Sequence, residues 1–207
     1  MRALRVCRVV AASFTLSGAA ATAQAPPALP GTMDVARVTG GTYAVDSGHT
    51  QIVFTVNHLG FNSYWGMFGG ATGTLTLDPA KPGTASVEIT VPMSGITTTS
   101  PELNAHLAGA DFFDAAKFPA ASFKSTAVKV SGTSATITGN LTLKGVTRPV
   151  TFDAKFTGAG KVPMIETQAI GFEATTSIRR SDFGMGYGVP MVSDVVPLRI
   201  TAAFEKK

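Results

Sequence analysis

The chain has almost no cysteine and few histidines. Its single cysteine is Cys7, and its three histidines, His49, His58 and His106, stand far apart. Zinc sites that can be recognised from sequence place such residues only a few positions apart. The G-x-S-x-G turn that carries the serine nucleophile of many hydrolases is also absent. We therefore expect a binding protein, with no disulfide, no metal site, no cofactor and no catalytic residues.

Charged side chains are scarce as well, at 14% of the 207 residues. Lys and Arg number 17 against 13 Asp and Glu, but three of the basic residues, Arg2, Arg5 and Arg8, lie at the N-terminus. Nothing in the remaining sequence resembles the concentrated basic stripe of a nucleic-acid-binding protein. We therefore exclude nucleic acid as a partner.

Only one long apolar run is present, from Val9 to Ala21, and serine, threonine and glycine interrupt it. The three arginines precede it, and Ala21-Thr22-Ala23-Gln24-Ala25 follows. A basic start, a short apolar middle and small residues spaced A-x-A are typical of a secretory signal peptide. A membrane anchor is the alternative, but a spanning helix needs about 20 apolar residues. We predict a signal peptide over 1–25 that is cleaved, removing Cys7, and no stable membrane insertion.

Helical periodicity is nearly absent, and alternation with period two takes its place. Between 134 and 157, Ile137, Phe152 and Phe156 share one face, while threonine, lysine and aspartate side chains occupy the other. Gly145 separates the two runs and can adopt a positive φ. This stretch predicts an antiparallel hairpin with one apolar face, which the rest of the chain must cover.

Similar alternation predicts further strands along most of the chain. Two segments are exceptions: the proline- and glycine-containing 26–41, predicted as a flexible leader, and 61–66, predicted as a turn-rich break that contains Trp65. The predicted strands cover the segments 51–59, 67–77, 86–91, 118–123, 128–130, 134–138, 168–178 and 195–204.

One short helix is predicted, from Ser100 to about Leu107, because Ser100 can cap the free amides and Pro101 suits the first helical position. Many strands and a single helix exclude a parallel α/β fold. We predict one all-β, antiparallel domain over 42–207. Its recurring apolar faces need either a second sheet or closure into a barrel, and the alternation alone does not separate these two folds.

Four segments resemble the YceI-like family, lipid-binding proteins of the bacterial periplasm. The resemblance implies a lipocalin-like barrel of about eight antiparallel strands with a helical insertion, which the helix at Ser100 matches. It also implies a periplasmic address and binding of polyisoprenoid chains or other long lipids. The segments are YAVDSGHTQIVFTVNHLG (43–60), HLAGADFFDAAKFPAASFKST (106–126), TGNLTLKGVTRPV (138–150) and GFEATTSIRRSDFG (171–184).

A barrel of about eight strands is either filled by its own side chains or holds one small ligand. The predicted strands mix large rings with small residues such as Ala174 and Ala202, which favours an open lumen. We expect it to hold a polyisoprenoid, quinone-like or other long lipid. The alternative is a filled barrel that acts as a structural or stress-related interaction module. The residues expected to contact the lipid are Phe54, Val56, His58, Trp65, Phe68, Phe112, Phe152 and Phe172.

Two polar residues carry further hypotheses. His58 lies on the apolar face of its predicted strand, either as a buried imidazole bonded to a carbonyl or as a contact to a ligand head group. Arg180 matches the family pattern Ile-x-Arg-x-Asp-Phe-Gly, and its guanidinium suits a phosphate-bearing head group. Bracing a loop is the alternative role for Arg180. In the helical insertion, Asn104, Ala108 and Gly109 depart from the family's more charged pattern, which weakens any charge-based role there.

Two partners besides the lipid stay open as hypotheses. One is a second copy of the chain, forming a homodimer. The other is a membrane cytochrome, because some relatives occur beside or fused to b-type cytochromes. Nothing in this sequence resembles a haem-binding helix, so such a partner would be a separate protein.

Overall fold

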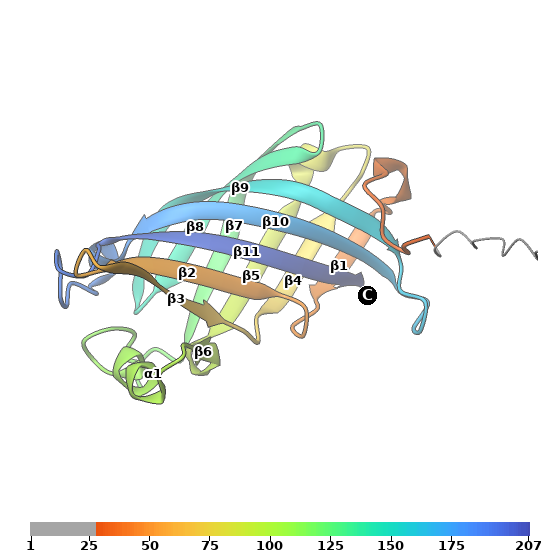
Figure 1. Cartoon of the computed structure of the whole chain (residues 1–207). Coiled ribbons are helices and arrows are strands. Elements are labelled where there is room, and N and C mark those ends of the chain that lie inside the picture. The colour runs from red at the N-terminus through yellow and green to blue at the C-terminus, as the bar shows by residue number, and fades with distance from the viewer. Residues whose placement is uncertain (1–27) are drawn as a thin grey trace, which may run out of the picture.

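The computed structural model describes residues 28–207. The predicted signal peptide over 1–25 and the first two residues of the predicted leader lie outside this range. The described chain forms an antiparallel barrel (Figure 1), in which eight strands pair in a ring that β1 and β11 close. In ring order the strands are β1 (Gly41–Val45), β4 (Thr72–Leu77), β5 (Ser86–Pro92), β7 (Ala120–Ser131), β8 (Ser134–Leu143), β9 (Val146–Lys161), β10 (Gln168–Arg179) and β11 (Val195–Lys206).

Strand β11 pairs with two consecutive strands, β1 and β2. Its end near Phe204 lies against Val45 of β1, and Leu198 lies against Phe54 of β2 (Gln51–His58). β1 and β2 therefore act as one bent strand along β11. β3 (Asn62–Phe68) pairs with β2, and β4 pairs with β1, so β3 and β4 together act as a second bent strand. The short strand β6 (Ile96–Thr97) pairs with the end of β3.

The segment 61–66 was predicted as a break, and this prediction is wrong. The turn is confined to three residues, in which Leu59 and Gly60 adopt positive φ angles of 56° and 76°. From Asn62 the backbone pairs in register with β2, with Asn62 opposite His58 and Trp65 opposite Thr55. Strand pairing therefore overrides the turn-forming composition of this segment.

The predicted helix and the predicted hairpin are both confirmed. α1 spans Pro101–Ala108, and the Ser100 side chain accepts a hydrogen bond of 3.2 Å from the amide of Leu103. In the hairpin, Ile137 lies opposite Phe152, and Gly145 has a φ of 74°. Four 3₁₀ turns complete the described helices: η1 (Val35–Arg37), η2 (Pro82–Thr84), η3 (Met93–Gly95) and η4 (Arg180–Phe183).

The two ends of the barrel differ. The end that we call the helix end carries α1, the β2–β3 turn, the β8–β9 turn and the loop 184–194 between η4 and β11. Figure 1 shows this end at the left. The pairing of β5 with β7 ends at Pro92 and Ala120. Among the described strands, β6 pairs with β3 and not with β7. The amide of Met93 still donates to the Pro119 carbonyl at 2.9 Å, and the segment that contains α1 connects β6 to β7 at this end.

The opposite end carries the β4–β5, β7–β8 and β9–β10 turns and the described part of the predicted leader. That part is attached to the barrel, because Thr32 and Ala159 of β9 exchange two backbone hydrogen bonds of 3.1 and 2.9 Å. Gly160 permits the close approach, since a Cβ there would overlap the carbonyl of Pro30. Residues 30–32 therefore pack against β9, ahead of the domain boundary predicted at residue 42.

Buried apolar side chains gather into two separate clusters. One lies towards the helix end and includes Phe54, Leu107 and Phe183. The other lies towards the opposite end and includes Tyr43 and Phe204. Most side chains that face the interior between the two clusters are only partly buried, which indicates that the interior there contains empty space.

Candidate ligand cavity

A cavity of about 1020 Å³ occupies the interior of the barrel. Its wall includes Val35 and Val38 of the N-terminal segment at one end and His58 and Tyr187 at the other. The cavity therefore reaches both ends of the barrel. A barrel filled by its own side chains would leave no such space.

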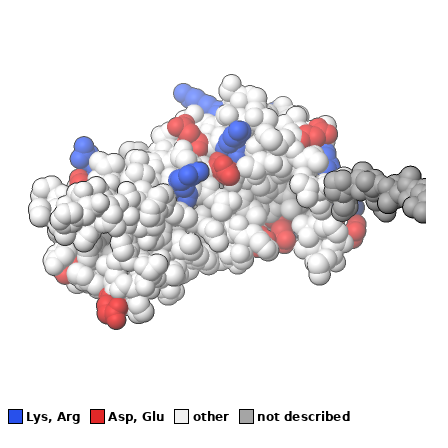
Figure 2. All heavy atoms as spheres, viewed as in Figure 1, with Lys and Arg blue, Asp and Glu red and all other residues white. Residues whose placement is uncertain are grey.

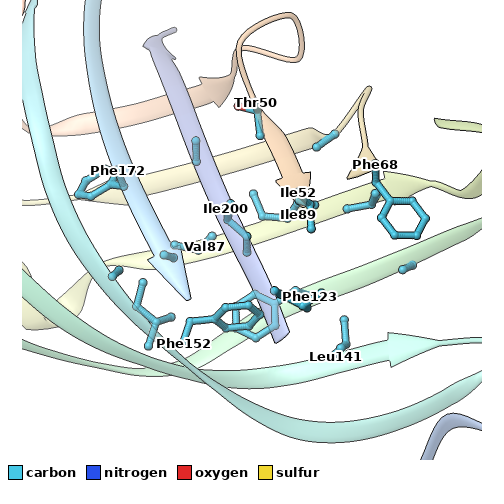
Figure 3. Close-up of a pocket in the computed structure, with 18 of the residues that line it drawn as sticks. Thr50, Ile52, Phe68, Val87, Ile89, Phe123, Leu141, Phe152, Phe172 and Ile200 are labelled. Carbon is cyan, nitrogen blue, oxygen red and sulfur yellow. The ribbon is translucent and has the colours of Figure 1, made fainter. Parts of the chain in front are cut away.

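The wall is built almost entirely from apolar side chains that alternate strands direct inward. Figure 3 shows Phe172, Val87, Ile89, Phe123 and Leu141 around a common space, together with Ile52, Phe152 and Ile200. Ile200, Val87 and Ile89 are only partly buried although they lie inside the barrel. Their remaining exposure is to the cavity, so an apolar ligand would cover it.

Aromatic rings shape the space along its length. The Phe123 and Phe152 rings meet edge to face at 4.9 Å between centroids, and the Phe172 ring meets that of Phe204 at 6.2 Å. Towards the helix end, the Phe54 and Phe68 centroids are 5.6 Å apart. These pairs narrow the lumen locally but do not close it.

Most of the residues predicted to contact a ligand do line the cavity. Trp65 does not, and its predicted place in the lumen is wrong. It lies opposite Thr55 on the outer face of β3, with 54% of its surface exposed, while its neighbour Tyr64 lines the cavity. The residues that do line it are Phe54, Val56, His58, Phe68, Phe112, Phe152, Phe172 and Arg180.

His58 lies at the mouth of the cavity at the helix end. It is exposed, and within residues 28–207 its imidazole makes no hydrogen bond. The interpretation of His58 as a buried, satisfied imidazole is therefore wrong. Its backbone bridges to Val192, which holds the β2–β3 turn against the loop 184–194.

Arg180 is buried, with 5% of its surface exposed, and its guanidinium braces the loop 184–194. Nε donates to the Ser193 carbonyl at 2.9 Å, and Nη2 donates to that of Val192 at 2.9 Å. Nη1 donates to the carbonyls of Met185 at 2.7 Å and Tyr187 at 2.8 Å. These bonds use four of the five donors of a guanidinium, which leaves one N–H for a ligand.

Arg180 lines the cavity as a buried residue, and this burial affects its pKa. Burial lowers the pKa of its guanidinium, and the carboxylate of Asp194 partly offsets this effect. Asp194 itself accepts hydrogen bonds from the Ser181 amide and hydroxyl at 2.9 and 2.8 Å, and chiefly the amide bond lowers its pKa. The loop that Arg180 braces is thus fixed at its base by Asp194 as well.

A cluster of three rings stands at the mouth. The centroid of His106 lies 5.0 Å from that of Phe112 and 5.3 Å from that of Tyr187, and the latter two are 5.5 Å apart. Tyr187 was not singled out from the sequence. The only sequence feature that could have indicated its role is that it is a single aromatic residue within a glycine-rich stretch. We call His106, Phe112 and Tyr187 the gate cluster.

Two general features complete the description of this part of the chain. Among residues 28–207, every helix falls short of the length and apolar character that crossing a membrane requires. Within the same residues, no three His, Cys, Asp or Glu side chains come together in a way that could hold a metal ion.

Comparison with known proteins places this geometry in context. Residues 43–204 match the YceI-like domain. Protein YceI of Salmonella arizonae is 40% identical over 153 residues, which cover 74% of this chain and 80% of that protein. The crystal structure of Burkholderia cenocepacia BcnA superposes with a TM-score of 0.69 at 26% identity, covering 77% of this chain and 98% of that one.

A second solved structure shares the fold at lower identity. It is a polyisoprenoid binding domain from Saccharophagus degradans implicated in plant cell wall breakdown, with a TM-score of 0.61 and 14% identity over 80% of this chain and 98% of that one. The resemblance seen in the sequence, the closed barrel and these comparisons agree. The chain belongs to the YceI-like family.

Proposed function

We propose that this protein binds one long apolar chain, a polyisoprenoid, quinone-like or other lipid, inside its barrel. The observation that carries the proposal is the apolar cavity of about 1020 Å³ that reaches both ends of the barrel. The proposed role is binding and carriage alone, without a reaction. The alternative of a filled interaction module lacks a comparable observation in its favour.

The size of the cavity favours a chain over a compact small molecule. Pockets for drug-sized ligands occupy about 300–1,000 Å³, so this cavity lies at the upper limit of that range. Burying each methylene group contributes about 0.8 kcal/mol, and association costs several kcal/mol. Ten methylenes contribute roughly 8 kcal/mol, so a long hydrocarbon binds well without polar contacts.

The polar groups of the wall suggest how the ligand is oriented. His58, Asn62, Tyr64 and Tyr187 line the cavity at the helix end, whereas Thr133 and Ser134 at the β7–β8 turn line it at the opposite end. Thr50, further along the wall, already bonds to the backbone of Ala203. We therefore place a polar head group near the helix end, where Arg180 has one N–H left, and the apolar tail towards the opposite end.

The carrier role rests on two further supports. The related domain from Saccharophagus degradans is described as a polyisoprenoid binding domain, and the N-terminal sequence predicts export. An apolar chain that crosses the aqueous periplasm needs a cover that excludes water. We propose that the barrel supplies this cover. A homodimer and a membrane cytochrome partner remain hypotheses.

Native mass spectrometry of the protein purified without detergent tests the proposal. We expect a complex heavier than the chain by one lipid. Ile200→Trp should displace this lipid, because Ile200 lines the cavity, whereas Thr201→Trp on the outer face of β11 should retain it. Lipid retention in both variants, or absence of lipid from the unaltered protein even after incubation with a lipid extract, would refute the proposal.

A further inference from the structure

The surface of the helix end carries a group of exposed apolar side chains. Leu59 and Phe61 lie in the β2–β3 turn with 41% and 87% of their surfaces exposed. Tyr187, Val189 and Met191 lie in the loop 184–194, with exposed fractions of 54%, 39% and 62%. We call these five residues the apolar rim.

The two segments of the rim form one continuous surface. The amide of Leu59 donates to the carbonyl of Met191 at 2.8 Å, and the amide of Ser193 donates to that of Asn57 at 3.0 Å. These bonds fix the turn and the loop side by side. The rim is therefore a built feature of the fold and not a set of separate exposed residues.

The rim has no charged side chains. The segments 47–77 and 183–193 contain no Asp, Glu, Lys or Arg. Asp182 and Asp194 flank the base of the loop. Lys144 donates a hydrogen bond of 3.2 Å to the Gly184 carbonyl there, and Asp111 contacts His106 beside Tyr187. These charges border the rim but do not belong to it. In Figure 2 the tip at the extreme left of the visible face is white, while charged side chains lie above and below it at the same end.

The rim is continuous with the mouth of the cavity. Tyr187 belongs to the rim and also lines the cavity, and His58 and Val192 line it beside rim residues. A chain that leaves through this mouth meets the rim first. If the rim faced water, every methylene group of the departing lipid chain would be exposed to water during transfer. This exposure costs about 0.8 kcal/mol of free energy for each methylene group.

From these observations we propose that the apolar rim docks onto a lipid bilayer, with the cavity mouth facing the membrane. This inference rests on the proposed function and names the surface that supplies or receives the apolar chain. A bilayer suits the rim because aromatic side chains favour the interface between head groups and hydrocarbon. The absence of charge allows the rim to enter that interface without burying an ion.

Trp65 lies at a depth consistent with this orientation. It is three residues beyond the start of β3, about 10 Å along the strand, and its ring points outward. Interfacial segments penetrate about 5–10 Å into the boundary between head groups and acyl chains. With the rim inserted, Trp65 reaches the head-group level.

Trp65 is the only tryptophan of the chain, so its fluorescence reports docking without a label. We expect phosphatidylcholine vesicles to shift its emission to shorter wavelength, and an increase of salt from about 0.05 to 0.5 M to leave the binding unchanged. Because Trp65 lies outside the cavity, filling of the lumen does not produce this shift.

A pair of matched variants makes the test specific. Phe61→Ser with Met191→Ser removes two rim side chains and should weaken partition into the vesicles by at least about tenfold. Met164→Ser with Ile165→Ser removes exposed apolar side chains in the β9–β10 turn at the opposite end and should leave partition unchanged. All proteins are expressed from the full coding sequence and purified without detergent.

The outcomes separate docking from ligand binding. Docking is overturned if the vesicles bind no protein, or if the two variants bind them equally well. If native mass spectra still show bound lipid in that case, the proposed function stands. Docking is also overturned if the unaltered protein binds no vesicles but forms a concentration-dependent dimer that the rim variant does not form. Vesicle binding lost only in the rim variant, which still retains its bound lipid, supports docking.

Discussion

Arg180 donates a hydrogen bond of 2.8 Å from Nη1 to the backbone carbonyl of Tyr187. A buried cation thus fixes the residue whose ring stands in the gate cluster. Through this bond the interior of the barrel determines the position of the loop 184–194, and the first two predictions follow from it.

Replacement of Arg180 by methionine should destabilise the fold. Four loop carbonyls would lose a charged donor, and we expect the free energy of unfolding to fall by about 3 kcal/mol. Arg179→Met is the matched control, because its side chain is largely exposed and pairs with Asp194 at 3.4 Å. Urea unfolding should place the control within about 0.5 kcal/mol of the unaltered protein. Equal losses in both variants would contradict the bracing role.

Removal of the Tyr187 ring should speed ligand exchange. Tyr187→Ala opens the gate cluster, so a fluorescent lipid should transfer between protein and vesicles several-fold faster, with little change in stability. Tyr187→Phe keeps the ring contacts with His106 and Phe112 and should exchange at the original rate. If the alanine variant transfers lipid no faster than the phenylalanine variant, the gate does not limit exchange.

Alanine at Gly66 should destabilise the wall of the barrel. A Cβ at this position overlaps the ring of Phe54 on the paired strand. Because the ring is packed against Phe68, we expect a loss of about 1–3 kcal/mol in unfolding free energy. Gly69→Ala serves as the control, since no atom lies within 4 Å of a Cβ there. Similar thermal midpoints for the two variants would show that the Phe54 ring moves freely.

Asp194 should contribute to the pH dependence of stability. Folding lowers its pKa from the ordinary value of 3.8, so the folded state binds this proton less tightly than the unfolded chain. The stabilisation is complete well above pH 3.8 and is lost as the pH falls through the lower folded value. Asp194→Asn should therefore be less stable than the unaltered protein at pH 7, and the difference should shrink at pH values below the folded pKa. A constant difference in urea midpoints across this range would contradict the assignment.

The alternation of side chains predicted the strands, but it did not predict for every residue whether its side chain faces the lumen or the solvent. Around Ile137 and Phe152 both faces of the hairpin are regular, so the sequence alone identified the inner face. Trp65 was misplaced because the segment around it was predicted as a turn, which left its side chain without a strand register. Once Asn62 pairs with His58, Trp65 must face outward.

The closure of the barrel and its mouth depend on contacts that no periodic pattern contains. The barrel was distinguished from a sandwich by family resemblance, because the pairing of Tyr43 with Lys206 joins strands far apart in sequence. The bracing role of Arg180 rests on carbonyl oxygens of the loop, which every residue possesses. Tyr187 reaches the gate through loop geometry, so its sequence position gave little indication of its role.

The shared use of β11 has a consequence for biogenesis. The strand that completes the ring is the last barrel strand to be synthesised, and its end pairs with the first. Until it emerges, the chain is an open sheet with two unpaired edges, which is a form prone to aggregation. Such non-local closure is intrinsically slow. The lumen can therefore close only after synthesis of the barrel is complete, and the open sheet needs protection from aggregation during that interval.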